Sequence, residues 1–426
     1  MTLGAGVLTA RADLAPALEA MSLAREASAA AEAKDLPTYL AKMEQAVALR
    51  PDFPRMLVDL AAAQVANGRN DDAIATLTQL AALGVTSSVE RSADFTALKE
   101  HKEFKSVAAK LAVNLRPVGR GEIAFSLREV TGLIEGIAWR PKDGAFFFGD
   151  VNGRAVWIRT AAEAKDGKPR RFTPEGDKLL GVFGLAVDEA NGVLWAATAA
   201  TSAMRGFLPE QDGEAALAEI DLETGAVRRV IPVVRKAGDR FSHVLGDLGV
   251  GVDGTVFVTD SGGPLIWRLP PGGAEIEPWV QSDYLMSGQG IVVTGDGRAL
   301  LVADHANGLL RIDIASRDIR LLAPPVGSTL IGLDGLVLAS TGEVIAIQNG
   351  LKPNRLLRIS LDAPGESITS VTVLESGHMA MAAPSLGCIA TAGELFFIGN
   401  AGWTRFENTD GQPSLPRTVP VFKTKL

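Results

Sequence analysis

The chain has 426 residues, of which 47% are hydrophobic and 22% charged, with a formal net charge of -8 and one cysteine. This length allows a substantial core and predicts two domains. Nucleic acid is excluded as a partner by the acidic balance without a basic cluster. An intrachain disulfide or a thiolate zinc cluster is excluded by the single Cys388.

No membrane span is predicted. The nearest candidate, residues 321–344, contains Pro324, Pro325, Asp334 and Glu343, so no uncharged apolar run reaches spanning length.

Residues 1–13 resemble the end of a secretory signal. A short apolar piece is followed by Ala10-Arg11-Ala12, a small-x-small pattern, and then by Asp13, although a charged segment at the start is missing. If the true start lies upstream, the protein is periplasmic or secreted; otherwise these residues are a frayed end of a cytoplasmic protein. We favour export.

Residues 14–115 carry apolar side chains at helical spacing. Tyr39, Met43 and Ala46 match three later residues, Ala73, Leu77 and Leu80, at an offset of 34 positions. This pattern resembles tetratricopeptide repeats, with an arbitrary helical hairpin as the alternative. The segment from Ala93, with Phe95, Leu98 and Phe104, resembles a capping helix. Such units bind a peptide, pack on a neighbouring domain or self-associate, and the sequence does not select among these roles. Residues 116–121, rich in Gly and Pro, are the predicted linker.

From residue 122 to residue 426 the chain is predicted to be mainly β. Six segments each consist of an apolar strand, a Gly-containing turn and a second apolar strand. They cover residues 136–150, 184–198, 248–260, 290–305, 335–349 and 386–400. Their start-to-start spacings of 48, 64, 42, 45 and 51 residues, obtained by subtraction, match one four-stranded blade each. We therefore expect a six-bladed β-propeller, closed by strand 122–129 or strand 419–426.

In a propeller, the residues just before each inner strand form a ring around the central channel. This ring is predicted to consist of Glu135, Phe183, Asp247, Gln289, Asp334 and Ser385. Three converging carboxylates repel one another unless a cation lies between them. Carboxylate and amide oxygens favour calcium or magnesium, with manganese and zinc left open. Glu135 and Asp334 are the strongest candidates, because each interrupts an apolar run where an unpaired charge is costly.

A second polar ring is predicted from the loops after each second strand. It contains Asp150 with Asn152, Thr198, Asp260 with Ser261, His305 with Asn307, Asn349, and Asn400. From this ring and the nearby His243 we expect substrate contacts by His243, Asp260, Asn349 and Asn400, and acid–base catalysis by His305. The alternative is that these side chains only cap strand ends.

The propeller segment resembles the senescence-marker-protein, gluconolactonase and luciferin-regenerating family. The resemblance lies in Glu135-Gly-Ile-Ala-Trp139, in Asp334-Gly-Leu with its following turn, and in Gly288-Gln-Gly-Ile. It implies a divalent-metal lactonase or esterase in which Glu135, Gln289 and Asp334 hold the metal, Asp247 lies near it, and Asp334 also serves as base.

Two positions depart from the family pattern. Gln289 stands where an Asn ligand is expected and is longer by a methylene, which calcium tolerates better than magnesium. Gly246 replaces the Asn of an Asn-Asp pair and removes a side chain that could contact substrate.

The leading interpretation is therefore a metal-dependent hydrolase of a lactone or related ester, with Glu135, Asp247, Gln289 and Asp334 as metal ligands. The alternative is a non-catalytic ligand-binding or scaffold protein that recruits a partner through its helical repeats. A metal-assisted lyase is a third interpretation, for which the sequence provides no identifiable channel acid.

Overall fold

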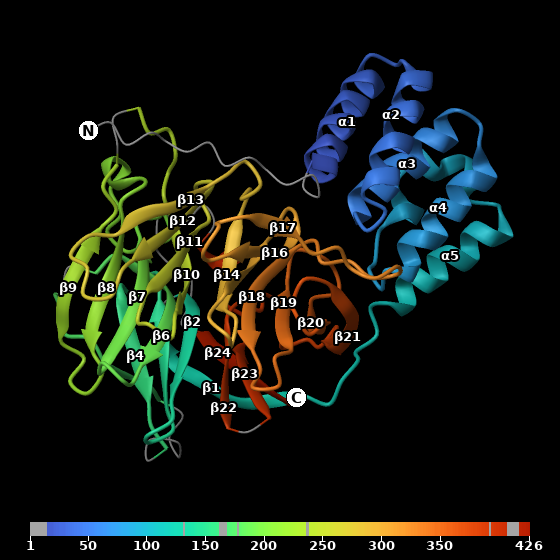
Figure 1. Cartoon of the computed structure of the whole chain (residues 1–426). Helices are drawn as coiled ribbons and strands as arrows, with labels where there is room; N and C mark the ends of the chain where they lie inside the picture. The colour runs from blue at the N-terminus through green and yellow to red at the C-terminus, as the bar shows by residue number, and fades with distance from the viewer. Residues whose placement is uncertain are drawn as a thin grey trace.

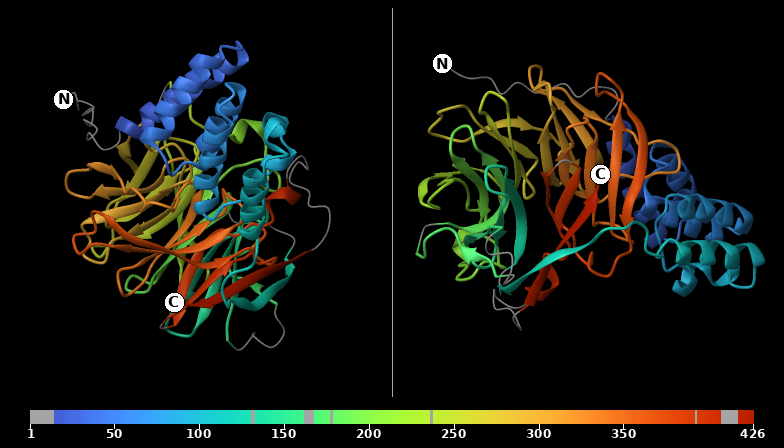
Figure 2. Two further views of the ribbon diagram at one scale, coloured as in Figure 1. Left: turned by 90° about the vertical axis from the view of Figure 1, so that its right-hand side faces the viewer. Right: turned by 90° about the horizontal axis from the view of Figure 1, so that it is seen from below.

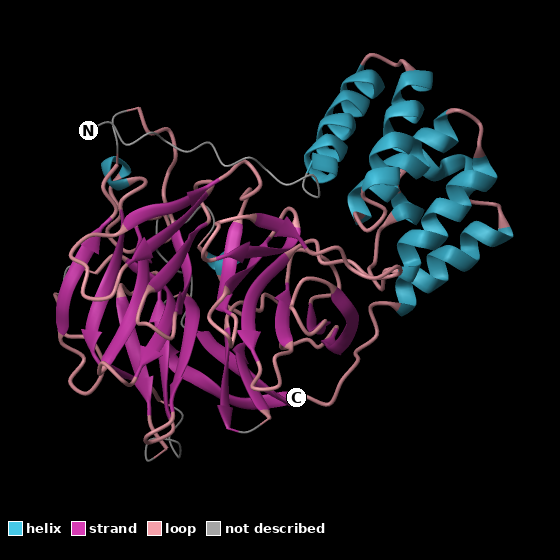
Figure 3. Ribbon diagram, in the orientation of Figure 1, coloured by secondary structure: helices cyan, strands magenta, loops and turns pink. Residues whose placement is uncertain are grey.

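The computed structural model describes residues 15–130, 133–161, 168–176, 179–235, 238–391, 393–406 and 417–426. The predicted signal remnant at residues 1–13 lies outside these ranges. A helical part lies beside a strand-built part, as Figures 1 and 3 show. No helix within the described ranges has the length and apolar character needed to cross a membrane.

The helical part contains five α-helices and two 3-10 turns among the described residues. They are α1 (Ala15–Glu32), α2 (Leu36–Leu49), α3 (Pro54–Ala66), α4 (Asn70–Ala82), η1 (Val89–Arg91), η2 (Ala93–Leu98) and α5 (Lys102–Val113). Helix α2 begins where the Asp35 carboxylate accepts a hydrogen bond from the Thr38 amide, a typical N-cap. The starts of α2 and α4 lie 70 − 36 = 34 residues apart, the offset that the sequence predicted. The resemblance of these helices to tetratricopeptide repeats stays a prediction.

The described strands form six four-stranded antiparallel sheets, which confirms the predicted six-bladed propeller. Blade one contains β2 (Ile134–Arg140), β3 (Ala145–Asp150), β4 (Ala155–Arg159) and β5 (Arg170–Arg171). Blade two contains β6 (Gly181–Asp188), β7 (Val193–Ala199), β8 (Ala215–Asp221) and β9 (Val227–Pro232). Blade three contains β10 (Leu245–Val250), β11 (Val256–Asp260), β12 (Leu265–Leu269) and β13 (Glu277–Gln281). Blade four contains β14 (Gly288–Val293), β15 (Ala299–Asp304), β16 (Gly308–Asp313) and β17 (Ile319–Leu321). Blade five contains β18 (Leu333–Leu338), β19 (Val344–Gln348), β20 (Arg355–Leu361) and β21 (Ile368–Ser376).

The sixth blade closes the ring with both ends of the propeller segment. Its order is β22 (Gly387–Thr391), β23 (Glu394–Ile398), β24 (Arg417–Lys425) and β1 (Glu122–Val130), so the N-terminal strand is outermost. The sequence does not indicate which end of the propeller segment supplies the outer strand. The structure uses both, because β24 pairs with β23 on one side and with β1 on the other. Closure therefore joins the two ends of the propeller by strand pairing.

The predicted linker is attached to blade five as an additional edge. Val118 and Ser376 exchange backbone hydrogen bonds of 2.9 and 3.0 Å. The buried Glu375 carboxylate accepts from the amide of Gly121 at 2.8 Å. A Cβ atom on Gly119, which has a φ of +103°, would lie 2.0 Å from Glu375 Oε2, so only glycine allows this close approach. The helices are thereby held at one side of the propeller (Figure 2).

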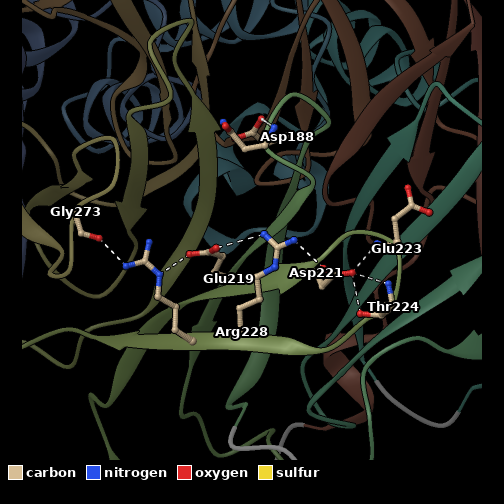
Figure 4. Close-up of polar contacts among 9 residues, drawn as sticks. Asp188, Glu219, Asp221, Glu223, Thr224, Arg228 and Gly273 are labelled. Carbon is tan, nitrogen blue, oxygen red and sulfur yellow. Dashed lines mark hydrogen bonds and ion pairs between the residues drawn. The ribbon is translucent and has the colours of Figure 1, made fainter.

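A network of ion pairs within the second blade lies near the surface, and one hydrogen bond to a carbonyl joins it to the third blade (Figure 4). Arg229 on β9 donates from Nη1 to the Gly273 carbonyl of the β12–β13 turn at 2.6 Å and also pairs with Glu219. Arg228 pairs with Asp221 at 2.7 Å. This network lies outside the cavity described next, and we assign it a structural role.

Candidate functional site

The site residues lie where the inner strands are irregular. Pairing between the first and second strand of a blade shifts between Ile134 and Gly136, and again between Leu333 and Leu336. The same interruption occurs at the start of β6, β10 and β14. Such bulges redirect a side chain out of the sheet's alternation. In five blades, the interruption therefore coincides with the residue predicted for the first ring.

These side chains line a cavity of about 500 Å³ at one end of the central channel. The lining residues are Glu135, Phe183, Thr201, Val244, Gly246, Asp247, Ser261, Ser287, Gln289, His305, Asp334, Asn349, Leu386 and Trp403. Of the predicted site residues, the cavity brings together Glu135, Asp247, Gln289, Asp334, His305 and Asn349. The described lining contains three carboxylates and no lysine or arginine.

Glu135 is a buried acid with one strong donor. Its Oε2 accepts a hydrogen bond of 2.7 Å from Trp403 Nε1. Burial raises the pKa of Glu135 well above its usual value, the charges of Asp334 and Asp247 raise it further, and the Trp403 bond opposes them. Glu135 therefore binds a proton strongly unless a positive charge lies nearby.

Asp247 is held mainly by the backbone. Its Oδ2 accepts from the Ile291 amide at 3.3 Å, and a Cβ on Gly184 would lie only 2.6 Å from its Oδ1. Burial raises the pKa of Asp247 to about 7, against the lowering effect of backbone donors and with a further increase from Asp334. The absence of a side chain at Gly184 thus leaves the space that this carboxylate fills.

Asp334 is oriented by Asn349. The Asn349 amide nitrogen donates to Asp334 Oδ2 and also to the Pro384 carbonyl at 2.9 Å. Burial raises the pKa of Asp334 to about 6, and the Asn349 bond counteracts part of that increase. Near neutral pH this carboxyl can therefore either accept or release a proton.

The carboxylate and amide oxygens of the cavity are suited to a hard cation, but the three described carboxylates do not lie close enough together to coordinate one ion. Gln289 Nε2 donates to Ser287 Oγ at 3.0 Å, which uses the amide nitrogen and not the oxygen that a cation would need. Within the described ranges, no three Asp, Glu, His or Cys side chains are close enough to hold a metal ion together. The chemistry of Glu135, Asp247 and Asp334 fits calcium or magnesium, whereas coordination requires these side chains to move closer together.

His305 directly follows β15 and faces the cavity beside the next blade. Its amide donates to the Ser287 carbonyl at 2.9 Å. A Cβ on Gly350 would lie 2.4 Å from His305 Nε2, so this glycine leaves room for the imidazole. His305 is thus the one histidine among the described lining residues.

His243 and Asp260 lie elsewhere than predicted. Both are fully buried and lie outside the cavity lining. Their side chains are 2.6 Å apart, and Asp260 also accepts from Trp267 Nε1 at 3.0 Å. In blade one Asp150 makes the same bond to Trp157, seven residues later, at 2.9 Å. His243 and Asp260 therefore lie outside the cavity lining, and their contacts within blade three fit the strand-capping alternative, while the substrate contacts stay a prediction.

The remaining predicted contact, Asn400, is half-buried in a backbone bridge to Ala383 and lies outside the cavity lining. Ser385, predicted in the first ring, also lies outside it and donates to the Glu135 carbonyl at 2.9 Å. Leu386 takes its place in the lining. In these two positions the sequence pattern located the correct loop but not the residue that faces the cavity.

Two polar lining residues, Thr201 and Ser287, were not predicted as site residues. Thr201 Oγ1 is buried and has no hydrogen-bond partner among the described residues. Ser287 and Thr201 lie in loops whose polar residues carry no periodic signal. Trp403, in η5 (Trp403–Arg405), reaches Glu135 from a distant part of the chain. These groups add hydrogen-bonding and apolar surface to the carboxylates.

Fold and cavity together define a six-bladed β-propeller with an acidic cavity at the start of its inner strands.

No family model matches the sequence, and no curated protein matches it. Among solved structures, luciferin-regenerating enzyme is similar with a TM-score of 0.47 and 14% identity, over 73% of this chain and 96% of that one. A calcium-binding protein, regucalcin, from Agrobacterium tumefaciens is similar with a TM-score of 0.45 and 13% identity, over 71% and 93%. A Bacteroides thetaiotaomicron protein of unknown function has a TM-score of 0.50 and 11% identity, over 72% of each chain. These likenesses concern the fold alone.

Proposed function

We propose that the protein is a divalent-cation-dependent hydrolase of a lactone or related ester. The observation that carries this proposal is the convergence of three buried carboxylates, Glu135, Asp247 and Asp334, on one cavity without lysine or arginine in its described lining. A bound cation would offset both their mutual repulsion and the cost of their burial. Gln289 is the proposed fourth oxygen ligand. Calcium is the favoured ion, because it tolerates irregular geometry and the longer Gln side chain.

The cation, when bound, would polarise the ester carbonyl and lower the pKa of water. Asp334, oriented by Asn349, is the proposed base that takes a proton from the attacking water. His305, which lines the cavity, is the proposed acid that returns a proton to the leaving alkoxide. Phe183, Leu386 and Trp403 provide apolar surface that limits water around the substrate.

The cavity volume of about 500 Å³ suits a small molecule. Its lining mixes hydroxyl and amide groups with aromatic and aliphatic surface, so a partly apolar ester fits it better than a fully polar sugar acid.

The deciding experiment measures cation content and affinity, by elemental mass spectrometry and calorimetry with calcium, magnesium, manganese and zinc. We expect about one ion per chain in the wild type and its loss in Asp334→Asn and Glu135→Gln. The matched control is Glu90→Gln, which removes an exposed acid in the helical part. A panel of lactones and aryl esters then tests hydrolysis. Full cation binding by Asp334→Asn, or no binding by the wild type, would overturn the proposal.

The second candidate is a ligand-binding protein without chemistry. It is favoured by the observation that the acids are not grouped as metal ligands within the described ranges. Under this alternative a ligand would be recovered unchanged by mass spectrometry after incubation with the protein, whereas a hydrolase would convert it.

Location and partners are further proposals. We propose export to the periplasm, tested by fractionation and N-terminal sequencing of the mature protein. We also propose that the helical part contributes to self-association or partner binding, tested by light scattering of the purified chain at several concentrations.

A further inference from the structure

The helical part contacts the propeller at two loops that also carry cavity residues. His305 begins the loop between β15 and β16, and Asn349 begins the loop between β19 and β20. Figure 1 shows loops of blades four and five reaching toward the helices. These loops therefore have one end at the cavity and the other at the helical part.

Arg50 bonds to the first of these loops. This residue follows α2, is 5% exposed, and donates from Nη2 to the Asn307 carbonyl at 3.1 Å, two residues after His305. Its Nε and Nη2 also bind the Asp52 carboxylate at 2.9 and 3.0 Å. A buried guanidinium is costly unless it is paired, and here the pair fixes the direction of a rigid donor.

The second loop is held from both sides. The Thr86 amide donates to the Lys352 carbonyl at 2.7 Å, and Arg355 Nη1 donates to the Leu83 carbonyl at 2.9 Å. Leu351 packs against the apolar core of the helices. Loop 349–354 is consequently part of the helical core as well as of blade five.

The two loops are also bonded to each other through Gly332. The Gly332 amide donates to the His305 carbonyl at 2.9 Å, and its own carbonyl accepts from the amides of Asn349 and Gly350 at 3.2 and 3.1 Å. Because His305 Nε2 occupies the space where a Cβ of Gly350 would lie, displacement of either loop moves the imidazole relative to the other. A continuous set of bonds thus joins Arg50 to His305 and Asn349.

We propose that the helical part is a positioning element for the cavity wall and that Arg50 is its principal positioning residue. By holding the Asn307 and Lys352 carbonyls, the helices fix the loops that present His305 and Asn349. This role differs from recruitment of a partner. It requires neither a bound cation nor hydrolysis, so it stands or fails separately from the proposed function.

The test compares Arg50→Met, Arg50→Lys and the control Arg55→Met in the full chain without cation or substrate. Arg55 has a side chain 78% exposed and pairs with Asp59 within α3. The imidazole signals of the four histidines are recorded at one pH by NMR, with His305→Gln to assign His305, together with amide exchange of peptides covering residues 304–309 and 349–353.

We expect Arg50→Met to shift or broaden the His305 signal and to speed amide exchange in both peptides at least several-fold. The buried His243 signal should stay unchanged. Arg50→Lys should show His305 signals and exchange rates between those of Arg50→Met and the wild type, because lysine keeps the charge but lacks the forked donor. Arg55→Met should resemble the wild type. A folded Arg50→Met variant with wild-type His305 signal and exchange would overturn the proposal.

If Arg50→Met does not fold, the same measurements on Leu351→Ala, a substitution in the propeller loop, test the proposal. It removes the side chain that packs into the helical core but leaves every hydrogen bond described above available. We expect faster exchange in residues 349–353 and a shifted His305 signal, and wild-type values for both would contradict the inference.

Discussion

The side-chain amide of Asn349 bonds simultaneously to the Asp334 carboxylate and to the Pro384 carbonyl. It thereby connects the proposed base in blade five to the chain that leads into blade six. The bond also opposes the increase in the pKa of Asp334 that burial causes. Asn349 therefore orients Asp334 and favours its charged form, against the larger effect of burial on the pKa.

Asn349→Leu should raise the pKa of Asp334 further above 6, because the donor that favours the charged form is lost. A hydrogen bond to a charged group contributes about 1.5–3 kcal/mol, so cation affinity at pH 7 should fall roughly tenfold or more. Calorimetric titration with calcium from pH 5.5 to 8.5 checks this. An unchanged pH midpoint would show that Asn349 does not control Asp334.

The cation-free protein should lose stability as pH rises from 5 to 8. The pKa values of Asp334 and Asp247 are raised to about 6 and about 7 from an ordinary value of 3.8. The folded state therefore binds more protons than the unfolded state between these limits, and the free energy of unfolding falls as pH increases through 6 and 7.

Urea unfolding in the presence of a chelator measures this effect. Asp247→Asn should flatten the upper part of the profile, and added calcium should restore stability at pH 8 because it binds the ionised carboxylates. Stability that is constant, or that rises with pH in the chelated wild type, would contradict the assignment of buried, unpaired acids.

Gly184→Ala should displace Asp247. The new Cβ would lie 2.6 Å from Asp247 Oδ1 and 2.8 Å from the Gly246 carbonyl oxygen, which forces the backbone or the carboxylate to move. We expect a lower melting temperature and at least severalfold weaker cation binding. The matched control is Gly295→Ala, where an added Cβ meets no atom within 4 Å. Equal cation affinity in the two variants would remove Asp247 from the proposed ligand set.

The fold could be predicted where the sequence carries a repeating pattern, and the site residues could be predicted only in part. The blades repeat a strand-turn-strand pattern, so the propeller was predictable, and the acids interrupt apolar runs, so Glu135 and Asp334 were detectable. The strand-end residues were harder to assign. Asp260 ends β11 and points into its blade, whereas Ser261, one position later, faces the cavity. A one-residue shift changes the side of a strand, and the loop sequence carries no signal that determines it.

The structural role of Asp260 gives its own prediction. Asp260→Ala should destabilise the protein by roughly 3–5 kcal/mol, since it leaves Nδ1 of buried His243 unpaired, although Nε2 keeps its contact with Asp239. The Asp260 bond is the main cause that raises the pKa of His243, so this stabilisation should be largest below pH 6.5 and decline as pH rises through the higher folded value. Denaturant unfolding checks the size and the pH trend. Cation affinity at low temperature, where the variant stays folded, should match the wild type, and a selective loss of binding would return Asp260 to the site.

Thr201→Val should weaken ligand binding without lowering stability, whereas Asp260→Ala should lower stability without weakening cation binding. Thr201 Oγ1 is buried against the cavity without a hydrogen-bond partner among the described residues, and a buried unpaired hydroxyl costs about 1–3 kcal/mol. Valine keeps the shape and removes the hydroxyl, so the melting temperature of the ligand-free protein should rise or stay constant. Affinity for an oxygen-bearing ligand should fall, because the hydroxyl that would pair with it is gone. Differential scanning fluorimetry with and without ligand measures both effects, and exposed Ser202→Ala is the neighbouring control. A lower melting temperature without ligand would mean that Thr201 already has a partner within the protein, and its role would then be structural.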